Sequence, residues 1–559
     1  MFKDFGQYGL VFLLLLTLNS LQAIELQRRD PALVTSPSGN YEPMRSKCSE
    51  DYHLRGKISG NAQLSIAEEN YINQKSKHSI PNWRKYLNLV NLTDFNIESF
   101  LQSTISKHEE ISSISTSLPN FAFAMSGGSM RSLCLGASIL DAFDERNPNS
   151  INAKIGGLLQ LANYASGLSG LPELNQTLWK LYKKNGLGDW NTIKSYPHVY
   201  KVIKKKKKAG FPTSMVDAWG RVLSKQFIDA PHEGEGVLWS SIRETESYKN
   251  QTYPFVIALS LSRPGSHMPV SIASPIYEYT SEDFSIWNPR LNASIPIEYL
   301  GSPSDSINQS VPCTVGFDNA GFVMGLASNF FSYQDSPKHK KGFFSSILGI
   351  FISDDDYEGK VPNTFKGLGQ DTSFPFQDSD SDTLLMGDPG LASENIPLFP
   401  LIQPFRKLDV IIAVDSANPN GTSLYMTYQK TQQPEYSAYQ FPKIPNTLDG
   451  TFESLGFNKR PTIFGCYDNY TGPLVLYLPN YRAVADTDEE SGLTTYPGEL
   501  VDKFFQNGFA IASQNEGPTR DLEWPQCIAC LLIDKQILKL NQTRTLQCQG
   551  CFDRYCAKF

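Results

Sequence analysis

The chain has 559 residues, of which 40% are hydrophobic and 12% aromatic, so it can bury a sizeable core. Its formal net charge of −7 argues against nucleic acid as a partner for the chain as a whole. Length and composition are those of an ordinary globular protein, and by themselves they allow one elaborated domain or several.

The N-terminus predicts a secretory signal peptide. Lys3 precedes an apolar run from Leu10 to Leu18, and Ala23 is a small residue suited to cleavage. The run falls short of the roughly 20 apolar residues of a membrane span, and the alternative is a buried N-terminal helix. No later stretch predicts a transmembrane segment, and the C-terminal CFDRYCAKF resembles neither a GPI-attachment tail nor an ER-retention address. We therefore expect a protein that is secreted or retained in the lumen of the secretory pathway.

Glycosylation motifs agree with this route. Eight Asn-X-Ser/Thr sequons predict surface positions and a glycoprotein: Asn91, Asn175, Asn250, Asn292, Asn308, Asn420, Asn469 and Asn541.

The order of apolar segments predicts an α/β core. Strand-like runs such as FAFAM, PFVIALS and LDVIIAVD alternate with helical runs such as SLCLGASILDAFDER. There is no internal repeat, so we expect a signal peptide over 1–23, a polar leader over 24–45, one large domain over 46–510 and a cysteine-rich segment over 511–559 packed on it. The Asp-, Ser- and Gly-rich stretch 353–395 is predicted to be a long surface excursion.

Five of the nine cysteines lie near the C-terminus, in two CxxC pairs followed by one more. This spacing would suit zinc, because two such pairs supply four thiolates, but in a secreted chain it favours disulfides. We therefore predict no metal. The odd total leaves one cysteine unpaired, and Cys134 is our candidate because it lies in an apolar helical pattern.

Two stretches have a membrane-contacting composition. The lysine run KVIKKKKKAG, from Lys201, is predicted to be a solvated loop, with anionic lipid head groups as the alternative ligand. The stretch 340–356, KKGFFSSILGIFISDDD, could touch a membrane or form a buried strand or helix, and it is too short to cross a bilayer.

The first segment that could carry chemistry is 121–147. An apolar strand runs into the SGGS turn at 126–129, and an amphipathic helix follows. A glycine turn at a helix N-terminus leaves backbone N–H groups that can hold negative charge. Arg131, in the first turn of the helix, could bind a phosphate.

The second segment, SGLSGLPEL at 166–174, has the features of a nucleophile elbow. Ser169 lies between Gly167 and Gly170, whose small size lets a helix pack against the preceding strand. Leu171 and the proline after it fit the G-x-S-x-G pattern less well, so a structural turn is the alternative.

The third segment is DPGLASENIPL, which begins at Asp388. A short apolar run precedes this aspartate, and a glycine-bearing turn follows it. The carboxylate could therefore point outward at the end of a strand, although a lone aspartate in such a place is commonly a turn residue.

Together, SGGSMRSL, GLSGLPE and DPGLASENIPL resemble motifs of the fungal lysophospholipase (phospholipase B) family, a relative of the patatin-like and cytosolic phospholipase A domains. Further segments also resemble that family, among them YEYTSEDFSIWNP, CTVGFDNAGFVMG and PLIQPFRKLDVIIAVDS. The resemblance runs in order from about Cys48 to Cys556.

The resemblance implies an α/β fold with a central mixed sheet flanked by helices. It implies Ser169 as the nucleophile and Asp388 as its base, with Gly127 and Gly128 forming the oxyanion hole. Arg131 would balance the substrate phosphate or support the oxyanion. No cofactor is implied, and the expected substrate is a lysophospholipid or phospholipid at a membrane or micelle surface, hydrolysed through an acyl-enzyme.

Three departures from the family pattern lie within these motifs: Ser129, Leu171 and Pro389 each stand where the pattern has glycine. The alternative to an active lysophospholipase is therefore a catalytically impaired member that acts as a lipid-binding or interaction glycoprotein. A histidine-triad hydrolase would instead need one of the seven histidines, none of which lies in the three motifs.

Overall fold

The structure is a computed structural model that describes residues 35–50, 52–57, 63–110, 118–168, 196–265, 269–329, 357–370, 375–416, 419–467, 470–488 and 496–559. The predicted signal peptide, the first half of the polar leader and the stretch 340–356 lie outside these residues. So do Ser169 and Leu171.

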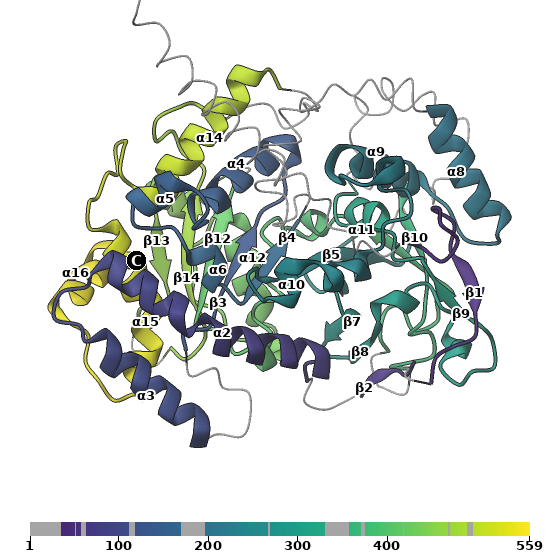
Figure 1. Ribbon diagram of the computed structural model, residues 1–559, viewed down its shortest axis with the longest axis horizontal. Coiled ribbons are helices and arrows are strands. Elements are labelled where there is room, and N and C mark those ends of the chain that lie inside the picture. The colour runs from purple at the N-terminus through teal and green to yellow at the C-terminus, as the bar shows by residue number, and fades with distance from the viewer. Residues whose placement is uncertain are drawn as a thin grey trace, which may run out of the picture.

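A mixed sheet of twelve strands forms the centre of the described chain (Figure 1). In spatial order its main path is β13 (Thr462–Phe464), β14 (Leu474–Pro479), β12 (Val410–Asp415), β3 (Phe121–Met125), β4 (Tyr164–Gly167), β5 (Phe255–Arg263), β6 (Ile276–Tyr279), β7 (Asp283–Asn288), β8 (Leu291–Pro296) and β2 (Arg55–Lys57). Off this path, β11 (Thr383–Gly387) pairs with β5 and with β10 (Gly359–Pro362). A separate pair joins β1 (Met44–Ser46) to β9 (Cys313–Val315).

The middle of the sheet is parallel. Strands β14, β12, β3, β4 and β5 run in one direction, and the other strands of the sheet pair antiparallel. Parallel strands are covered on both faces, which explains why FAFAM and VIIAVD are nearly continuous apolar runs. The predicted α/β fold with a central mixed sheet is confirmed.

Helices cover both faces of the sheet. They are α2 (Ile66–Val90), α3 (Ile97–Glu110), α4 (Ser129–Ala142), α5 (Pro148–Asn152), α6 (Leu158–Leu161), α8 (Tyr196–Lys208), α9 (Met215–Phe227), α10 (Glu246–Lys249), α11 (Ala320–Leu326), α12 (Thr422–Thr431), α13 (Thr451–Ser454), α14 (Gly498–Ser513), α15 (Trp524–Lys539) and α16 (Leu546–Tyr555).

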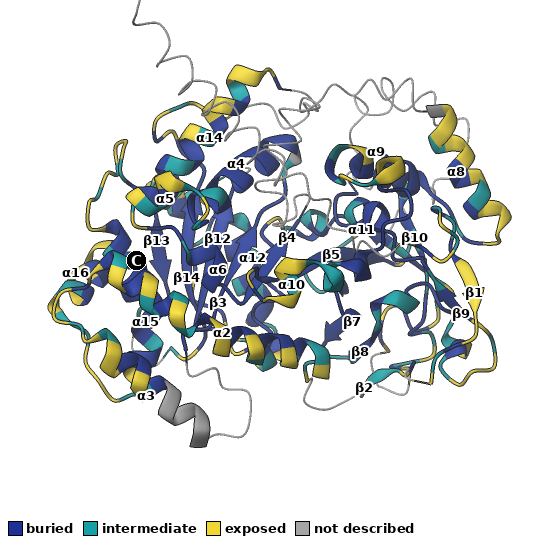
Figure 2. Ribbon diagram, viewed as in Figure 1, coloured by how far each residue is buried: buried dark blue, intermediate teal, exposed yellow. Residues whose placement is uncertain are grey.

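Alternate residues of β3 enter two different cores. Phe121, Phe123 and Met125 pack in a core with α4, α14 and α15, whereas Ala122 and Ala124 pack in a second core with α12. This alternation is the ordinary consequence of side chains pointing to opposite faces of a strand. The strands are buried almost throughout, as Figure 2 shows.

The C-terminal cysteines form disulfides, as predicted. Two bridges, Cys527–Cys551 and Cys530–Cys548, join α15 to α16 in the nested order that antiparallel helices require. A third, Cys466–Cys556, ties the end of the chain to the segment after β13.

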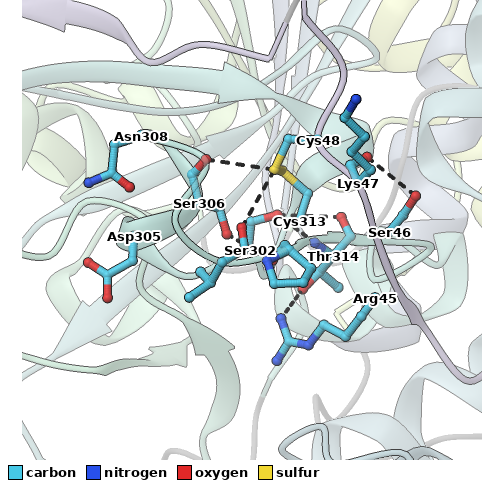
Figure 3. The surroundings of a disulfide bond; sticks show 12 residues. Arg45, Ser46, Lys47, Cys48, Ser302, Asp305, Ser306, Asn308, Cys313 and Thr314 are labelled. Carbon is cyan, nitrogen blue, oxygen red and sulfur yellow. Dashed lines mark hydrogen bonds between the residues drawn. A yellow bond between two sulfur atoms is a disulfide. The ribbon is translucent and has the colours of Figure 1, made fainter.

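The fourth disulfide, Cys48–Cys313, lies beside the β1–β9 pair, where Figure 3 also shows Arg45 bonded to Thr314. Cys134 is the free cysteine, and burial raises the pKa of its thiol to about 12. Its place in the apolar core of α4 agrees with the prediction and makes it an inert thiol.

The expectation of a surface excursion over 353–395 is wrong for the described part of that stretch. Both β10 and β11 belong to the central sheet. Several of its polar residues are buried with partners: Glu358 pairs with Arg263 at 2.8 Å, and the Asn363 amide donates to the Asp378 carbonyl at 2.8 Å. An Asp- and Ser-rich composition therefore concealed a structural element.

The lysine run from Lys201 is helix α8 and not a loop. Lysine has a good helix propensity, and Val202 and Ile203 supply an apolar side that is buried against the rest of the protein.

A buried ion cluster joins α2, β6 and the 404–406 turn. The Arg406 guanidinium donates to Glu68 of α2 at 3.0 Å and to Glu278 of β6 at 2.8 Å, and all three side chains are almost completely buried. Breaking a buried cluster by removal of one partner typically costs about 3–5 kcal/mol, because a charge is left uncompensated. The cluster therefore fixes α2 and the 404–406 turn against the sheet.

Candidate active site

The first two predicted motifs meet at the ends of two adjacent parallel strands. β3 and β4 are in register from Ala122 opposite Tyr164 to Met125 opposite Gly167. The 126–129 turn follows β3, and residue 168 follows β4. Ligands of open α/β sheets bind outside the carboxyl ends of such strands.

The closeness of the two motifs depends on Gly127. A Cβ atom on this residue would lie 2.9 Å from Cδ2 of Leu168, a distance that carbon atoms do not adopt without displacement. Leu168 is itself fixed, because its N–H donates to the Met125 carbonyl at 3.2 Å. The predicted nucleophile Ser169 is the next residue and lies outside the described residues.

The turn continues through Gly128, the N-cap of α4, which has φ +134°. Only glycine adopts this conformation readily. Ser129 is the first helical residue, so its backbone has right-handed helical angles and does not need the glycine of the family pattern. Among the described residues, the Gly128 N–H has no acceptor, and the first-turn amides of α4 point out of the helix.

The Gly127 amide is already engaged. Its N–H donates to the Asn395 carbonyl at 2.8 Å. In this structure the Gly127 proton is therefore engaged, and a bond to an oxyanion would have to share or replace the bond to Asn395. The oxyanion hole at Gly127 and Gly128 stays a prediction.

Asp388 follows β11, a strand that points toward the end of β4 from the opposite direction. β4 and β11 both pair with one edge of β5, β4 parallel as far as Gly167 opposite Ala258, and β11 antiparallel as far as Gly387 opposite Leu261. The two pairing points are three residues apart, or about 10 Å at the usual rise per strand residue. The carboxyl ends of β4 and β11 therefore face each other across this short gap.

The Asp388 carboxyl is buried, and desolvation raises its pKa to about 6. Among the described residues, its one hydrogen-bond donor is the Gly390 N–H at 2.7 Å, and no cation or histidine pairs with it. Pro389 begins the short 3-10 helix Pro389–Ala392, whose first amide needs no partner. The substitution of glycine by proline thus fits the local backbone.

The 388–399 segment connects all parts of the site. Besides the bond from Gly127 to Asn395, the Pro397 carbonyl accepts the Ser166 hydroxyl of β4 at 2.7 Å. The Ile396 N–H donates to Ser423 of α12 at 3.2 Å. One continuous segment therefore carries Asp388 and contacts both the 126–129 turn and β4.

Glu394 was not predicted from the sequence, although it is a lone acid in the apolar run ASENIPLFPL. Its carboxylate accepts the Phe399 N–H at 2.7 Å and holds the segment in a closed turn. Burial raises the pKa of Glu394 to about 7, while Lys430, whose ammonium lies 3.9 Å from the centre of the Phe399 ring, opposes this shift.

Arg131 is buried in the first turn of α4, and its Nη1 donates to Asp488 at 3.1 Å. The loop before Asp488 is held by Asn507 of α14, whose amide oxygen accepts the Ala483 and Val484 N–H groups. The predicted phosphate-binding arginine thus lies beside the turn and is partly neutralised by an exposed carboxylate.

The predicted sequons have different exposures. Asn91, Asn250, Asn308 and Asn541 are exposed, Asn292 and Asn420 are partly buried, and Asn175 and Asn469 lie outside the described residues. Across the described ranges, there is no cluster of three or more His, Cys, Asp or Glu side chains arranged to hold a metal ion. None of the helices described is both long and apolar enough to cross a membrane.

A protein-family model and known proteins match most of the chain. The family model for the lysophospholipase catalytic domain matches residues 121–558. The chain belongs to this lysophospholipase family. Lysophospholipase 2 of Aspergillus fumigatus is 32% identical, over 94% of this chain and 94% of its own length. Lysophospholipase 3 of Saccharomyces cerevisiae is 31% identical, over 93% of this chain and 82% of its own length.

The fold of this lysophospholipase-family chain is also that of human GIVD cytosolic phospholipase A2. The TM-score is 0.63 at 14% identity, covering 88% of this chain and 69% of the human chain. The prediction that the chain is an enzyme of the lysophospholipase family with a cytosolic phospholipase A-type fold is confirmed.

Gly127→Ala should lower activity without unfolding the protein. The added Cβ would push Leu168 and the residue after it out of position, and a shift of about 1 Å can lower the rate of a positioned reaction ~10²-fold. We expect ester hydrolysis to fall by about that factor while the protein stays folded by circular dichroism. The control is Gly550→Ala on α16, where the new Cβ meets open space. Equal activities of the two variants would contradict the close approach.

Proposed function

We propose that the chain is a lysophospholipase that hydrolyses the acyl ester of lysophospholipids through Ser169 and Asp388. The observation that carries this proposal is the convergence of β4 and β11 on one edge of β5. Ser169 follows Leu168 directly in the chain, and Leu168 packs against Gly127. Chain continuity thus favours a Ser169 hydroxyl within reach of the Asp388 carboxylate.

Asp388 has the properties of a general base. A carboxylate in water is a weak base at neutral pH, and desolvation strengthens it. With a pKa of about 6, Asp388 is largely ionised at pH 7 and can still take the proton of Ser169. The serine would attack the ester carbonyl, and the protonated Asp388 would return the proton to the departing glycerol oxygen. Water, activated by the same carboxylate, would then release the fatty acid from the acyl-enzyme.

The oxyanion would form at the start of α4. We assign the two donors to the Gly128 and Ser129 amides, because the Gly127 N–H is bonded to Asn395. Both lie at a helix N-terminus, where backbone N–H groups and the helix dipole favour negative charge. Arg131, in the same turn, would add positive charge toward the oxyanion or the substrate phosphate.

The alternative function, a catalytically impaired lipid-binding glycoprotein, rests on the three departures from the family motifs. Two of them have a structural account that leaves catalysis intact: Ser129 has helical backbone angles, and Pro389 begins a 3-10 helix. Leu171 lies outside the described residues. The active enzyme is therefore the function that the described geometry supports better.

A secretory route is part of the proposal. Four disulfides are the pattern of an oxidising compartment, and four of the predicted sequons are exposed. We propose a secreted or lumenal glycoprotein that meets its substrate at a membrane or micelle surface.

The direct test is release of fatty acid from lysophosphatidylcholine. The purified glycoprotein should release it, and Ser169→Ala and Asp388→Asn should each lower kcat at least ~10³-fold because each removes an atom that forms or breaks a bond. Ser454→Ala is the matched control, since that serine is exposed on α13, its hydroxyl bonds to the nearby Thr451 carbonyl and it lies outside the site. Wild-type protein that binds lysolipid but releases no more fatty acid than Ser169→Ala would favour the alternative function.

The pH dependence should report Asp388. Only the ionised carboxylate can accept a proton, so kcat/KM should rise with pH and reach half of its plateau near pH 6, about two units above an ordinary aspartate. Glu394→Gln should leave this rise of kcat/KM near pH 6 unchanged, because glutamine retains the acceptor for the Phe399 N–H but does not titrate. A rise of kcat/KM near pH 4 would contradict the assignment to Asp388. So would the loss of the rise near pH 6 in Glu394→Gln.

A further inference from the structure

Helix α8 presents a face of lysines that the proposed reaction does not use. The run 204–208 is entirely lysine, and Lys201 lies one turn earlier. At helical spacing these residues divide between two sides of the helix. The side toward the protein contains Val202, Ile203 and Lys206, all buried. The opposite side is exposed and forms what we call the lysine face: Lys201, Lys204, Lys207 and Lys208.

One lysine of the run holds the helix in place. The Lys206 ammonium is buried and donates to Asp217 of α9 at 2.6 Å. Asp217 also accepts the Tyr41 hydroxyl at 2.8 Å and the Ser214 N–H at 2.7 Å, and the ammonium lies 4.0 Å from the centre of the Phe322 ring. Because Lys206 and the two apolar residues fix α8 rigidly, the lysine face has a defined direction.

Among the described residues, the lysine face has no counter-charges. Across the described chain, none of its four lysines forms an ion pair, and the carboxylates bonded to α8 are Asp217, through Lys206, and Glu235, through His198 at 2.8 Å. Like charges three and four residues apart on a helix repel each other. The helix dipole favours lysines in the last turn, 205–208, but that effect does not extend to Lys201 and Lys204.

The position of α8 makes this face accessible. Figure 1 shows α8 at one outer edge of the molecule, far from α15 and α16, and Figure 2 shows its outward side as exposed. Tyr200 lies within the lysine face, 41% exposed, with the Lys204 ammonium 5.6 Å from the centre of its ring. Tyrosine is suited to the boundary between water and lipid, because its ring is apolar and its hydroxyl is polar.

We propose that the lysine face of α8 binds the surface of a membrane that carries anionic phospholipids. A planar anionic surface can contact all four lysines at once, so the local positive charge of this face can act although the whole chain has a net charge of −7. Each lysine near such a surface strengthens binding roughly fivefold. The proposal deepens the proposed function, since it brings the enzyme to the place where its lipid substrates lie.

Vesicle co-sedimentation tests the proposal without reference to catalysis. The glycoprotein should bind vesicles of phosphatidylcholine with phosphatidylserine much better than vesicles of phosphatidylcholine alone, and salt should weaken the binding. Changing the four lysines of the lysine face to Gln should reduce this binding about tenfold or more. The matched control carries the same change of net charge at four exposed lysines elsewhere: Lys77, Lys443, Lys459 and Lys558, each changed to Gln. The control should bind like the wild type.

Two further measurements separate this inference from the proposed function. Changing the lysine face to Arg keeps the charge and should keep vesicle binding. The Gln variant should hydrolyse a soluble short-chain ester at the wild-type rate, while Ser169→Ala should bind vesicles normally even if it hydrolyses nothing. Equal wild-type binding to both kinds of vesicle would overturn the proposal, as would an equal loss in the scattered control. Salt-sensitive binding to nucleic acid without binding to vesicles would overturn it too.

Discussion

The pairing of β4 and β11 with the same edge of β5 is the constraint on which the rest of the site depends. β4 arrives parallel and β11 antiparallel, so the two strands end facing each other and Leu168 and Asp388 occupy the space between. The register must be held strictly, because a slip of one residue would turn each side chain to the opposite face of the sheet. The 388–399 segment holds it, through bonds to Gly127 and Ser166.

Among the described residues, no positive partner lies beside the buried Asp388 carboxyl, and this has a cost in stability. Its pKa in the folded protein, about 6, lies above the value of roughly 3.9 expected in the unfolded chain. The folded state therefore binds the proton more tightly, and this group makes the protein less stable as the pH rises from about 4 to about 6. Four disulfides and the fully paired Arg406 cluster stabilise the surrounding structure. A buried carboxylate with a raised pKa beside the ends of sheet strands is typical of a group kept for chemistry.

Much of the fold could be predicted because it depends on residues that lie close together in the sequence. FAFAM has the pattern of a strand buried on both faces, Gly128 in the 126–129 turn has a backbone conformation that favours glycine, and Cys134 lies in an apolar helical pattern. These features depend on short-range spacing and on side-chain size. The motifs also identified Asp388 and Arg131, and the structure brings both to the ends of β3 and β11.

The rest depended on contacts between residues distant in sequence. That the Gly127 amide is occupied follows from the place of Asn395, and no spacing within the 126–129 turn reveals it. Glu394 matters because its carboxylate closes on Phe399 after the segment has folded. The strands of the 353–395 stretch were hidden by an acidic composition whose polar groups find partners only in the tertiary structure. The nested pairing of the C-terminal cysteines likewise required the antiparallel packing of α15 and α16.

The central claim is that Ser169 is the residue activated by Asp388, and covalent labelling addresses it most directly. A fluorophosphonate reacts with an activated serine hydroxyl, and peptide mapping then identifies the modified residue. The account predicts a single phosphonylated residue, Ser169, in the wild-type glycoprotein and a much slower reaction in Asp388→Asn of unchanged fold. Labelling at another serine, or equal labelling rates in the two proteins, would contradict it.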